Sequence, residues 1–218
     1  MVSNVISDFK KKLDQLLEEC REESYQYFDK NIRPLPKNES GEFIITRKYF
    51  YDNDVDAFRH AYTSGVFTQE FFTVFANVLG VVNEMRGNNT LQAQNMDLWN
   101  NSIGRKNGEK TESRTMLAEL LKKALENGEM IISPDDPREY KGLRHFDIDP
   151  EKPVRTLEES KTGLNQQFFD VFNYKLMTRQ EFINEISSGN YPGYQVAKRG
   201  DLEYPMSRAD AFASNNLG

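Results

Sequence analysis

The chain has a single cysteine, Cys20, among its 218 residues. One thiol cannot form an intramolecular disulfide, and it leaves no cysteine cluster that could bind zinc. The fold must therefore be stabilised by packing alone, which suits either a reducing compartment or a structure that never needed bridges.

Clustered positive charge and long apolar runs are also missing. The formal net charge of −6 argues against nucleic acid as a partner, because binding to its phosphates depends on grouped Lys and Arg. The most apolar run, residues 71–82, is shorter than the roughly 20 residues that cross a bilayer, so we expect no transmembrane segment. The N-terminus lacks the apolar region of a Sec signal, so we expect any export from the cytoplasm to use dedicated secretion machinery.

Several common catalytic motifs are absent from the sequence. It contains no Gly-x-Ser-x-Gly elbow, no Walker loop, no Rossmann glycine pattern and no His-Glu-x-x-His. These absences exclude the usual nucleotide-binding and metalloprotease families, and we expect no cofactor and no bound metal.

Hydrophobic periodicity predicts a mainly α-helical chain. Apolar residues recur at steps of three and four over residues 4–30, which is typical of an amphipathic helix, and 15 Phe and 10 Tyr must fill much of the core. Residues 42–51, rich in β-branched and aromatic side chains, predict a short strand or extended arm. Further helices are predicted over residues 52–65, 68–85, 91–103 and 117–125, and after the capping-box spacings Thr156–Glu159 and Thr178–Glu181.

These elements predict one compact multi-helix domain over residues 1–218. Its core would be residues 52–132, with the helices of residues 150–218 packed on it. Residues 189–218, with Pro192, Gly193 and Pro205, indicate an irregular C-terminal tail.

The first candidate for chemistry is the segment from Asp56 to Tyr62. A step of four residues places Asp56 and His60 on one helical face, where the carboxylate could orient the imidazole and raise its basicity. His60 is one of only two histidines, and this arrangement is half of a general-base site. The alternative is a partly buried histidine that merely hydrogen-bonds its neighbour.

Two further segments add polar side chains. Glu84 emerges at the end of an apolar run, where burial would raise the pKa of its carboxyl, although it could equally be an ordinary charge at a helix end. Asp97, Asn101 and Arg105 follow one another at four-residue steps and form a polar stripe beside Asn100. Asp and Asn are poor helix formers, and such poor local choices often mark a functional need.

In this order, Arg-His-Ala-Tyr, then Asn-Glu, then Met-Asp-Leu-x-Asn-Asn-x-x-Gly-Arg, the motifs resemble an uncharacterised helical domain that recurs in bacterial secreted toxins and effectors. They are also similar to type VI secretion effectors of the TseH kind, which are regarded as cell-wall hydrolases. The resemblance covers residues 52–132. By motif position it implies roles for His60, Glu84, Asp97, Asn100, Asn101 and Arg105.

The sequence departs from the family pattern at two positions. Asn83 stands where a histidine is common, and Thr63 stands where a tryptophan is common. The first departure argues against a metal site with two histidines, because one histidine with carboxylates and amides is a poor zinc set.

Cys20 is a separate candidate nucleophile, as in papain-like peptidases, if it meets His60 in space. Its step of four residues from Leu16 places it on the apolar face of the first helix, which favours an inert packing role instead.

Three functions remain open. The first is a secreted antibacterial effector that hydrolyses peptidoglycan, as an amidase or endopeptidase, in the periplasm of a target cell. His60 would be its base, oriented by Asp56 and supported by Glu84 and Asp97, and Asn100, Asn101 and Arg105 would bind substrate. The second is a phospholipase-type effector. The third is a non-catalytic binding, immunity or adaptor module; in the first two cases we expect a cognate immunity protein as a further partner.

Overall fold

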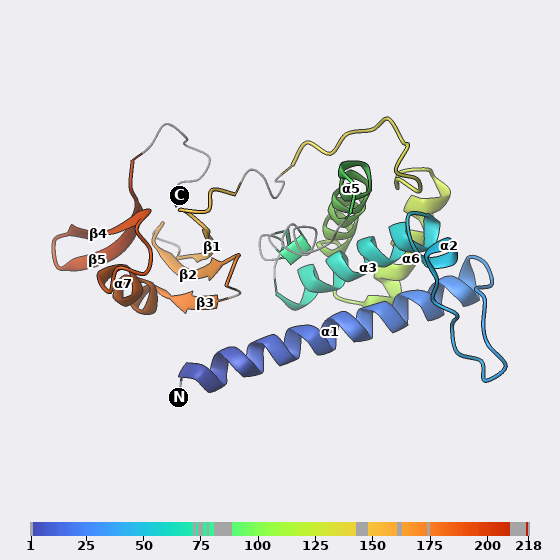
Figure 1. The fold of residues 1–218 in the computed structure, drawn as a ribbon, viewed down its shortest axis with the longest axis horizontal. Helices are drawn as coiled ribbons and strands as arrows, with labels where there is room; N and C mark the ends of the chain where they lie inside the picture. The colour runs from blue at the N-terminus through green and yellow to red at the C-terminus, as the bar shows by residue number, and fades with distance from the viewer. Residues whose placement is uncertain are drawn as a thin grey trace. The chain divides into compact units, whose positions relative to one another are not determined.

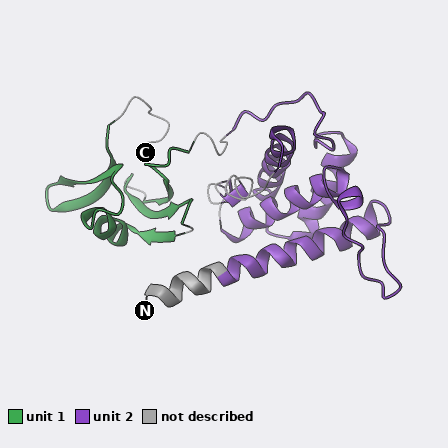
Figure 2. Cartoon of the chain, viewed as in Figure 1, with its two compact units in different colours: residues 1–8, 144–218 green, residues 9–143 purple. Residues whose placement is uncertain are grey.

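The computed structural model of the chain falls into two compact units (Figure 2). We call residues 9–143 the helical unit, and residues 1–8 with 144–218 the mixed unit. The sequence predicted one domain, whereas the contacts divide the chain, and each unit is described by itself. The structure describes residues 2–71 (2–10 as backbone only), 73, 76–77, 79–80, 89–142, 148–160, 163–173, 175–209 and 217.

Helices form the helical unit, as hydrophobic periodicity predicted (Figure 1). The first helix is confirmed and runs slightly beyond the predicted ends, and the helix predicted at residues 117–125 is confirmed within a longer one. The helices are α1 (Val2–Asn31), α2 (Arg47–Phe50), α3 (Asp54–Glu70), α5 (Leu91–Gly108) and α6 (Arg114–Glu126).

The helix ends predicted at residues 65 and 103 are wrong, because α3 continues past Gly65 to Glu70 and α5 continues past Gly104 to Gly108. Both glycines lie inside helices, where they allow close packing. A Cβ on Gly65 would lie 2.8 Å from the Leu117 side chain and 3.0 Å from the carbonyl oxygen of Gly104. The helix predicted over residues 68–85 begins inside α3, and most of its remainder lies outside the described residues.

Aromatic side chains fill the core between α1 and α3, as the composition predicted. Phe58 stacks on Tyr27 with ring centroids 5.7 Å apart, and it meets Phe28 edge to face at 5.7 Å. The segment predicted as a strand or arm is extended only at its start, where Phe43 bridges Lys37, and then forms the short helix α2.

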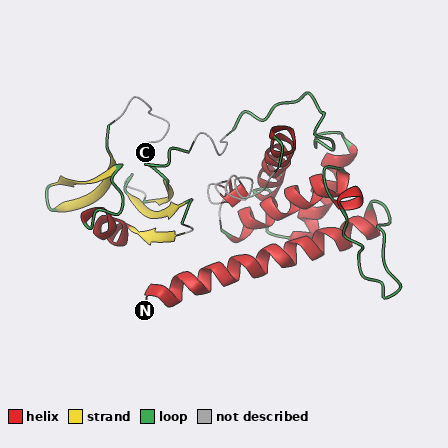
Figure 3. Cartoon of the chain, in the orientation of Figure 1, coloured by secondary structure: helices red, strands yellow, loops and turns green. Residues whose placement is uncertain are grey.

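The mixed unit holds the strands (Figure 3). Strands β1 (Val154–Glu159), β2 (Asn165–Asp170) and β3 (Lys175–Thr178) form an antiparallel sheet in that order. The helix predicted after Thr156 is wrong: Val154 and Phe168 are buried in a common core, and pairing with β2 outweighs the local capping pattern. The second capping box is confirmed at Thr178 and Glu181, which begin α7 (Arg179–Ser187).

The prediction of an irregular tail is wrong over residues 194–207, which form a hairpin. Strands β4 (Tyr194–Arg199) and β5 (Leu202–Ser207) pair antiparallel, and Gly200 takes the positive φ of 63° that the two-residue turn requires. Tyr194 packs on Phe182 of α7 with ring centroids 5.1 Å apart.

The chain is thus mainly α-helical with small antiparallel sheets. None of the helices in the described part has both the length and the apolar character needed to cross a membrane.

Candidate functional site

The first turns of α3 hold three polar side chains, Asp56, Arg59 and His60, at the centre of the helical unit. The helix begins at Asn53, whose side chain accepts hydrogen bonds from the N–H groups of Val55 and Asp56. The chain reaches this cap through Asp52 in the left-handed region, at φ 56°, and the N–H of Asp52 donates to Asp56 Oδ2 at 2.8 Å. The helix start therefore fixes the Asp56 carboxylate.

Small residues bring α5 against α3 close to this point. A Cβ on Gly104 would lie 2.0 Å from the carbonyl oxygen of Ala61, and one on Gly108 would lie 2.5 Å from that of Gly65. Ala61 and Gly65 are four residues apart, as are Gly104 and Gly108, so one face of each helix is nearly bare backbone. This contact sets Asp97 and Asn101, which lie on α5, beside His60.

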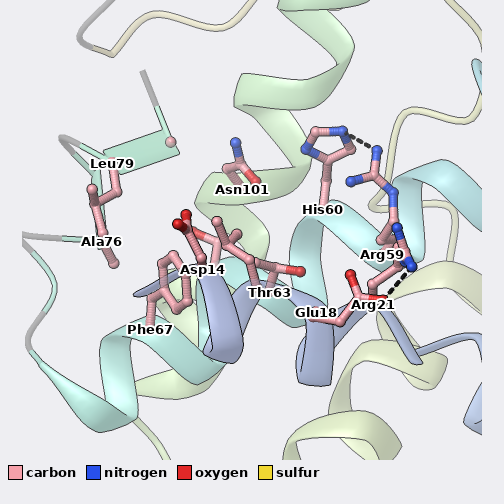
Figure 4. Close-up of a pocket in the computed structure, with 13 residues that line it drawn as sticks. Asp14, Glu18, Arg21, Arg59, His60, Thr63, Phe67, Ala76, Leu79 and Asn101 are labelled. Carbon is pink, nitrogen blue, oxygen red and sulfur yellow. Dashed lines mark hydrogen bonds and ion pairs between the residues drawn. The ribbon is translucent and has the colours of Figure 1, made fainter. Parts of the chain in front are cut away.

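The His60 imidazole lies at the meeting point of both helices. Its Nε2 is 2.7 Å from Arg59 Nη2, 3.3 Å from Asp97 Oδ1 and 3.7 Å from Asp56 Oδ1. Because a guanidinium can only donate, Nε2 accepts from Arg59, and the proton of the neutral ring is on Nδ1. The other side of the ring faces Asn101, whose side chain also hydrogen-bonds it (Figure 4).

Burial and charge together keep this imidazole neutral. Burial lowers the pKa of His60 and the Arg59 guanidinium lowers it further, which outweighs the opposite effects of Asp97, Asp56 and Asn101. Burial alone would raise the pKa of Asp56, but Arg59, His60 and the Asp52 N–H favour the carboxylate, and the net shift is downward. Asp56 is thus held as an anion next to a neutral ring.

His60 and Asn101 line a cavity of about 240 Å³ (Figure 4). Residues of α1 and α3 form its walls, with charges of both signs at Asp14, Glu18, Arg21 and Arg59. Its apolar side is formed by Leu17, Phe67, Ala76 and Leu79. Of the predicted site residues, His60 and Asn101 therefore line a concavity, and Asp56 and Asp97 are buried next to the imidazole.

The polar side chains that were predicted to form a stripe on α5 have different roles. Asn100 is fully buried, and its amide donates to the carbonyl of Ile131 at 2.7 Å and accepts from the Ile131 N–H at 3.0 Å. Its hydrogen bonds thus serve to fix the backbone at Ile131. Arg105 is 8% exposed, and its Nη2 donates to the Tyr140 hydroxyl at 3.2 Å. Burial lowers the pKa of Arg105, and its Nη1 has no hydrogen-bond partner within the described part of the chain.

Cys20 does not join this cluster. Cys20 is fully buried on α1, and burial raises the pKa of its thiol to about 12, so the thiolate that a nucleophile needs is scarce. Glu84 lies outside the described residues.

Sequence reasoning missed Arg59, although it lies inside the Arg-His-Ala-Tyr motif. Its Nη2 donates to Asp56 Oδ1 at 2.5 Å as well as to His60. The signal was its step of three residues from Asp56, which places an acid and a base on one face of a helix.

Chemically, the cluster offers one imidazole nitrogen and two carboxylates next to a cavity. Asp56, His60 and Asp97 each place one ligand atom within 4.8 Å of the other two, so these three could hold a metal ion. They could equally take a proton from a water molecule in the cavity.

The comparisons with known proteins give one match. A family model described as a domain of unknown function, DUF6973, matches residues 41–129, which include the whole cluster. No curated protein and no solved structure matches the chain.

Proposed function

We propose that the helical unit is a hydrolase domain of a secreted antibacterial effector, and that its substrate is peptidoglycan. The observation that carries the proposal is the neutral imidazole of His60, which contacts the buried Asp97 carboxylate and lines a cavity together with Asn101. Residues of α3 and α5, far apart in the sequence, meet there. Such a convergence of titratable groups in a concavity is what active sites require.

In the proposed reaction, a water molecule in the cavity attacks an amide carbonyl of the cell-wall peptide. The cluster of Asp56, His60 and Asp97 accepts one proton of the water as the C–O bond forms. That proton passes to the leaving nitrogen as the C–N bond breaks, and the products are a carboxylate and an amine. That His60 is the base remains a prediction. In that role its Nε2 must accept a proton, so the hydrogen bond from Arg59 to Nε2 has to break first.

The charges of the cavity favour a polar peptide over a lipid. Asp14, Glu18, Arg21 and Arg59 present both signs around a small space, whereas an acyl chain needs a long apolar channel. Peptides of the cell wall carry both amino and carboxylate groups and suit this lining. Action in the periplasm of a target cell, and neutralisation by an immunity protein, belong to the same proposal.

The test is digestion of purified peptidoglycan by the full chain, with released fragments identified by mass spectrometry. We expect His60→Ala to reduce release at least about 100-fold, in line with the loss of an acid–base group. Lys106→Ala, at an exposed position of α5, is the matched control and should retain full activity.

Liposomes and peptidoglycan are assayed side by side. Lipid hydrolysis without cell-wall release would replace the proposal by a phospholipase. Unchanged peptidoglycan release by a folded His60→Ala variant would contradict a catalytic role for His60. If the wild type hydrolyses neither substrate, a non-catalytic binding module is favoured.

A further inference from the structure

The arrangement of Asp56, His60 and Asp97 has the dimensions of a metal site. Metal–ligand bonds of about 2.1 Å place neighbouring ligand atoms about 3.0 Å apart around an octahedral ion and about 3.4 Å apart around a tetrahedral one. The observed separations from His60 Nε2 are 3.3 Å to Asp97 and 3.7 Å to Asp56. All three ligand atoms lie within 4.8 Å of one another, so closing them onto one ion needs movements of about 1 Å.

The guanidinium of Arg59 already places a positive charge between two of these ligands. The Nη2 atom of Arg59 lies 2.5 Å from Asp56 Oδ1 and 2.7 Å from His60 Nε2. It thus accepts electron density from the same carboxylate and the same imidazole lone pair that would bind a metal. The guanidinium shows that the cluster selects positive charge at this point.

Arg59 is also able to leave this position. Its side chain is 24% exposed and lines the cavity, so it can rotate toward solvent without crossing the core. In its present place its Nε is buried and has no hydrogen-bond partner among the described residues, which is unfavourable for a donor. Exposure to the cavity would satisfy that donor.

We infer that Asp56, His60 and Asp97 form a binding site for a divalent first-row metal ion of the Mn²⁺ type, and that Arg59 is the internal cation that the ion displaces. Two carboxylates favour Mn²⁺, and one imidazole is compatible with it. The sequence predicted no metal, because one histidine with carboxylates and amides is a poor set of ligands for zinc. The pairing of α3 with α5 supplies the second carboxylate, Asp97, that the local motif lacks.

The role of the ion in hydrolysis rests on the proposed function. A divalent ion lowers the pKa of a water that it binds, so it would supply the nucleophile while His60 serves as a ligand. Binding itself is independent of any reaction and is tested first.

The experiment measures Mn²⁺ binding to the metal-free full chain by electron paramagnetic resonance and calorimetry. We expect one ion per chain, and we expect Arg59→Gln to bind it at least about 10-fold more tightly, because the competing internal cation is gone. Asp97→Asn should weaken binding at least about 10-fold. Asp54→Asn, on α3 but paired with Arg33, is the matched control and should bind as the wild type does.

A second measurement does not depend on the folding of a variant. Electron spin echo spectra of the wild-type complex should show coupling of the Mn²⁺ spin to an imidazole nitrogen, and His60→Gln should abolish it. Absence of this coupling in a saturated complex overturns the inference. So does a failure of both the wild type and Arg59→Gln to bind Mn²⁺ at 1 mM, roughly the weak limit of specific protein sites.

The two proposals fail in different ways. Specific Mn²⁺ binding without any hydrolysis would support the metal site and contradict the proposed hydrolase function. Hydrolysis that persists undiminished in a chelator, in a chain that binds no Mn²⁺, would support the hydrolase function and contradict the metal site.

Discussion

Gly104 lies so close to Ala61 that a Cβ added to it would stand 2.0 Å from the Ala61 carbonyl oxygen. Ala61 directly follows His60 on α3, and Asn101 lies one turn before Gly104 on α5. The distance between these two backbones therefore decides whether the imidazole reaches Asp97 and Asn101. A close helix crossing, built from small residues, is the structural basis of the candidate site.

Replacement of Gly104 by Ala should consequently be severe. The new methyl group meets backbone, which cannot rotate away, so α3 and α5 must separate, and we expect a loss of about 3 kcal/mol or more of unfolding free energy. Urea denaturation measures this loss. Lys106→Ala, two residues further on an exposed face of α5, should change stability by less than about 0.5 kcal/mol, and equal effects of the two variants would show that the crossing is not tight.

The buried state of His60 predicts a pH-dependent stability. Its pKa in the folded chain lies below the ordinary value of 6.5. Below pH 6.5 the imidazole is therefore protonated in the unfolded chain but still neutral in the folded chain, which favours unfolding. The corresponding contribution to stability is complete above pH 6.5 and is lost as the pH falls toward the folded-state pKa, with a slope of at most about 1.4 kcal/mol per pH unit.

Denaturation of the wild type and His60→Gln between pH 7 and pH 5 isolates this effect. The range lies above the pKa of Asp56, which is held below its ordinary 3.8, so that carboxylate stays charged throughout. We expect the wild type to lose more stability on acidification than the variant. Parallel pH profiles would mean that His60 titrates normally in the folded chain.

Asn100 should prove structural, in contrast to its neighbour Asn101. Its replacement by Ala leaves both the N–H and the carbonyl of Ile131 without their buried partners, and we expect a loss of about 2–4 kcal/mol. Gln92→Ala, at an exposed position of α5, is the comparison and should be nearly neutral. A neutral Asn100→Ala would indicate that water or another group readily replaces the amide.

The thiol of Cys20 should be unreactive in the native chain. It is fully buried and its pKa is about 12, so a thiol reagent at pH 8 should label it only when the chain unfolds. Labelling is followed by absorbance with and without 6 M urea, and Cys20→Ala should retain whatever hydrolytic activity the wild type shows. Rapid labelling of the folded chain would restore the thiol as a candidate nucleophile.

Much of the helical unit could be predicted from sequence, because its helices are amphipathic and their caps are local. Asn53, Thr90 and Ser113 cap helices with their own side chains, and each needs only the few residues that follow. The mixed unit was harder to predict. Thr156 and Glu159 have the spacing of a capping box but lie in a strand, since pairing with distant residues decides the outcome.

The sequence by itself determined the polar composition of the site: Asp56 and His60 share a helical face because they are four residues apart, and Asp97 and Asn101 do so for the same reason. Only the tertiary structure decided that the two pairs meet and that Arg59 hydrogen-bonds Nε2 of His60. It also decided that the Asn100 side chain hydrogen-bonds the backbone of Ile131. The reason is physical, since helical periodicity is a local property, whereas contact between α3 and α5 depends on glycines that allow two backbones to touch.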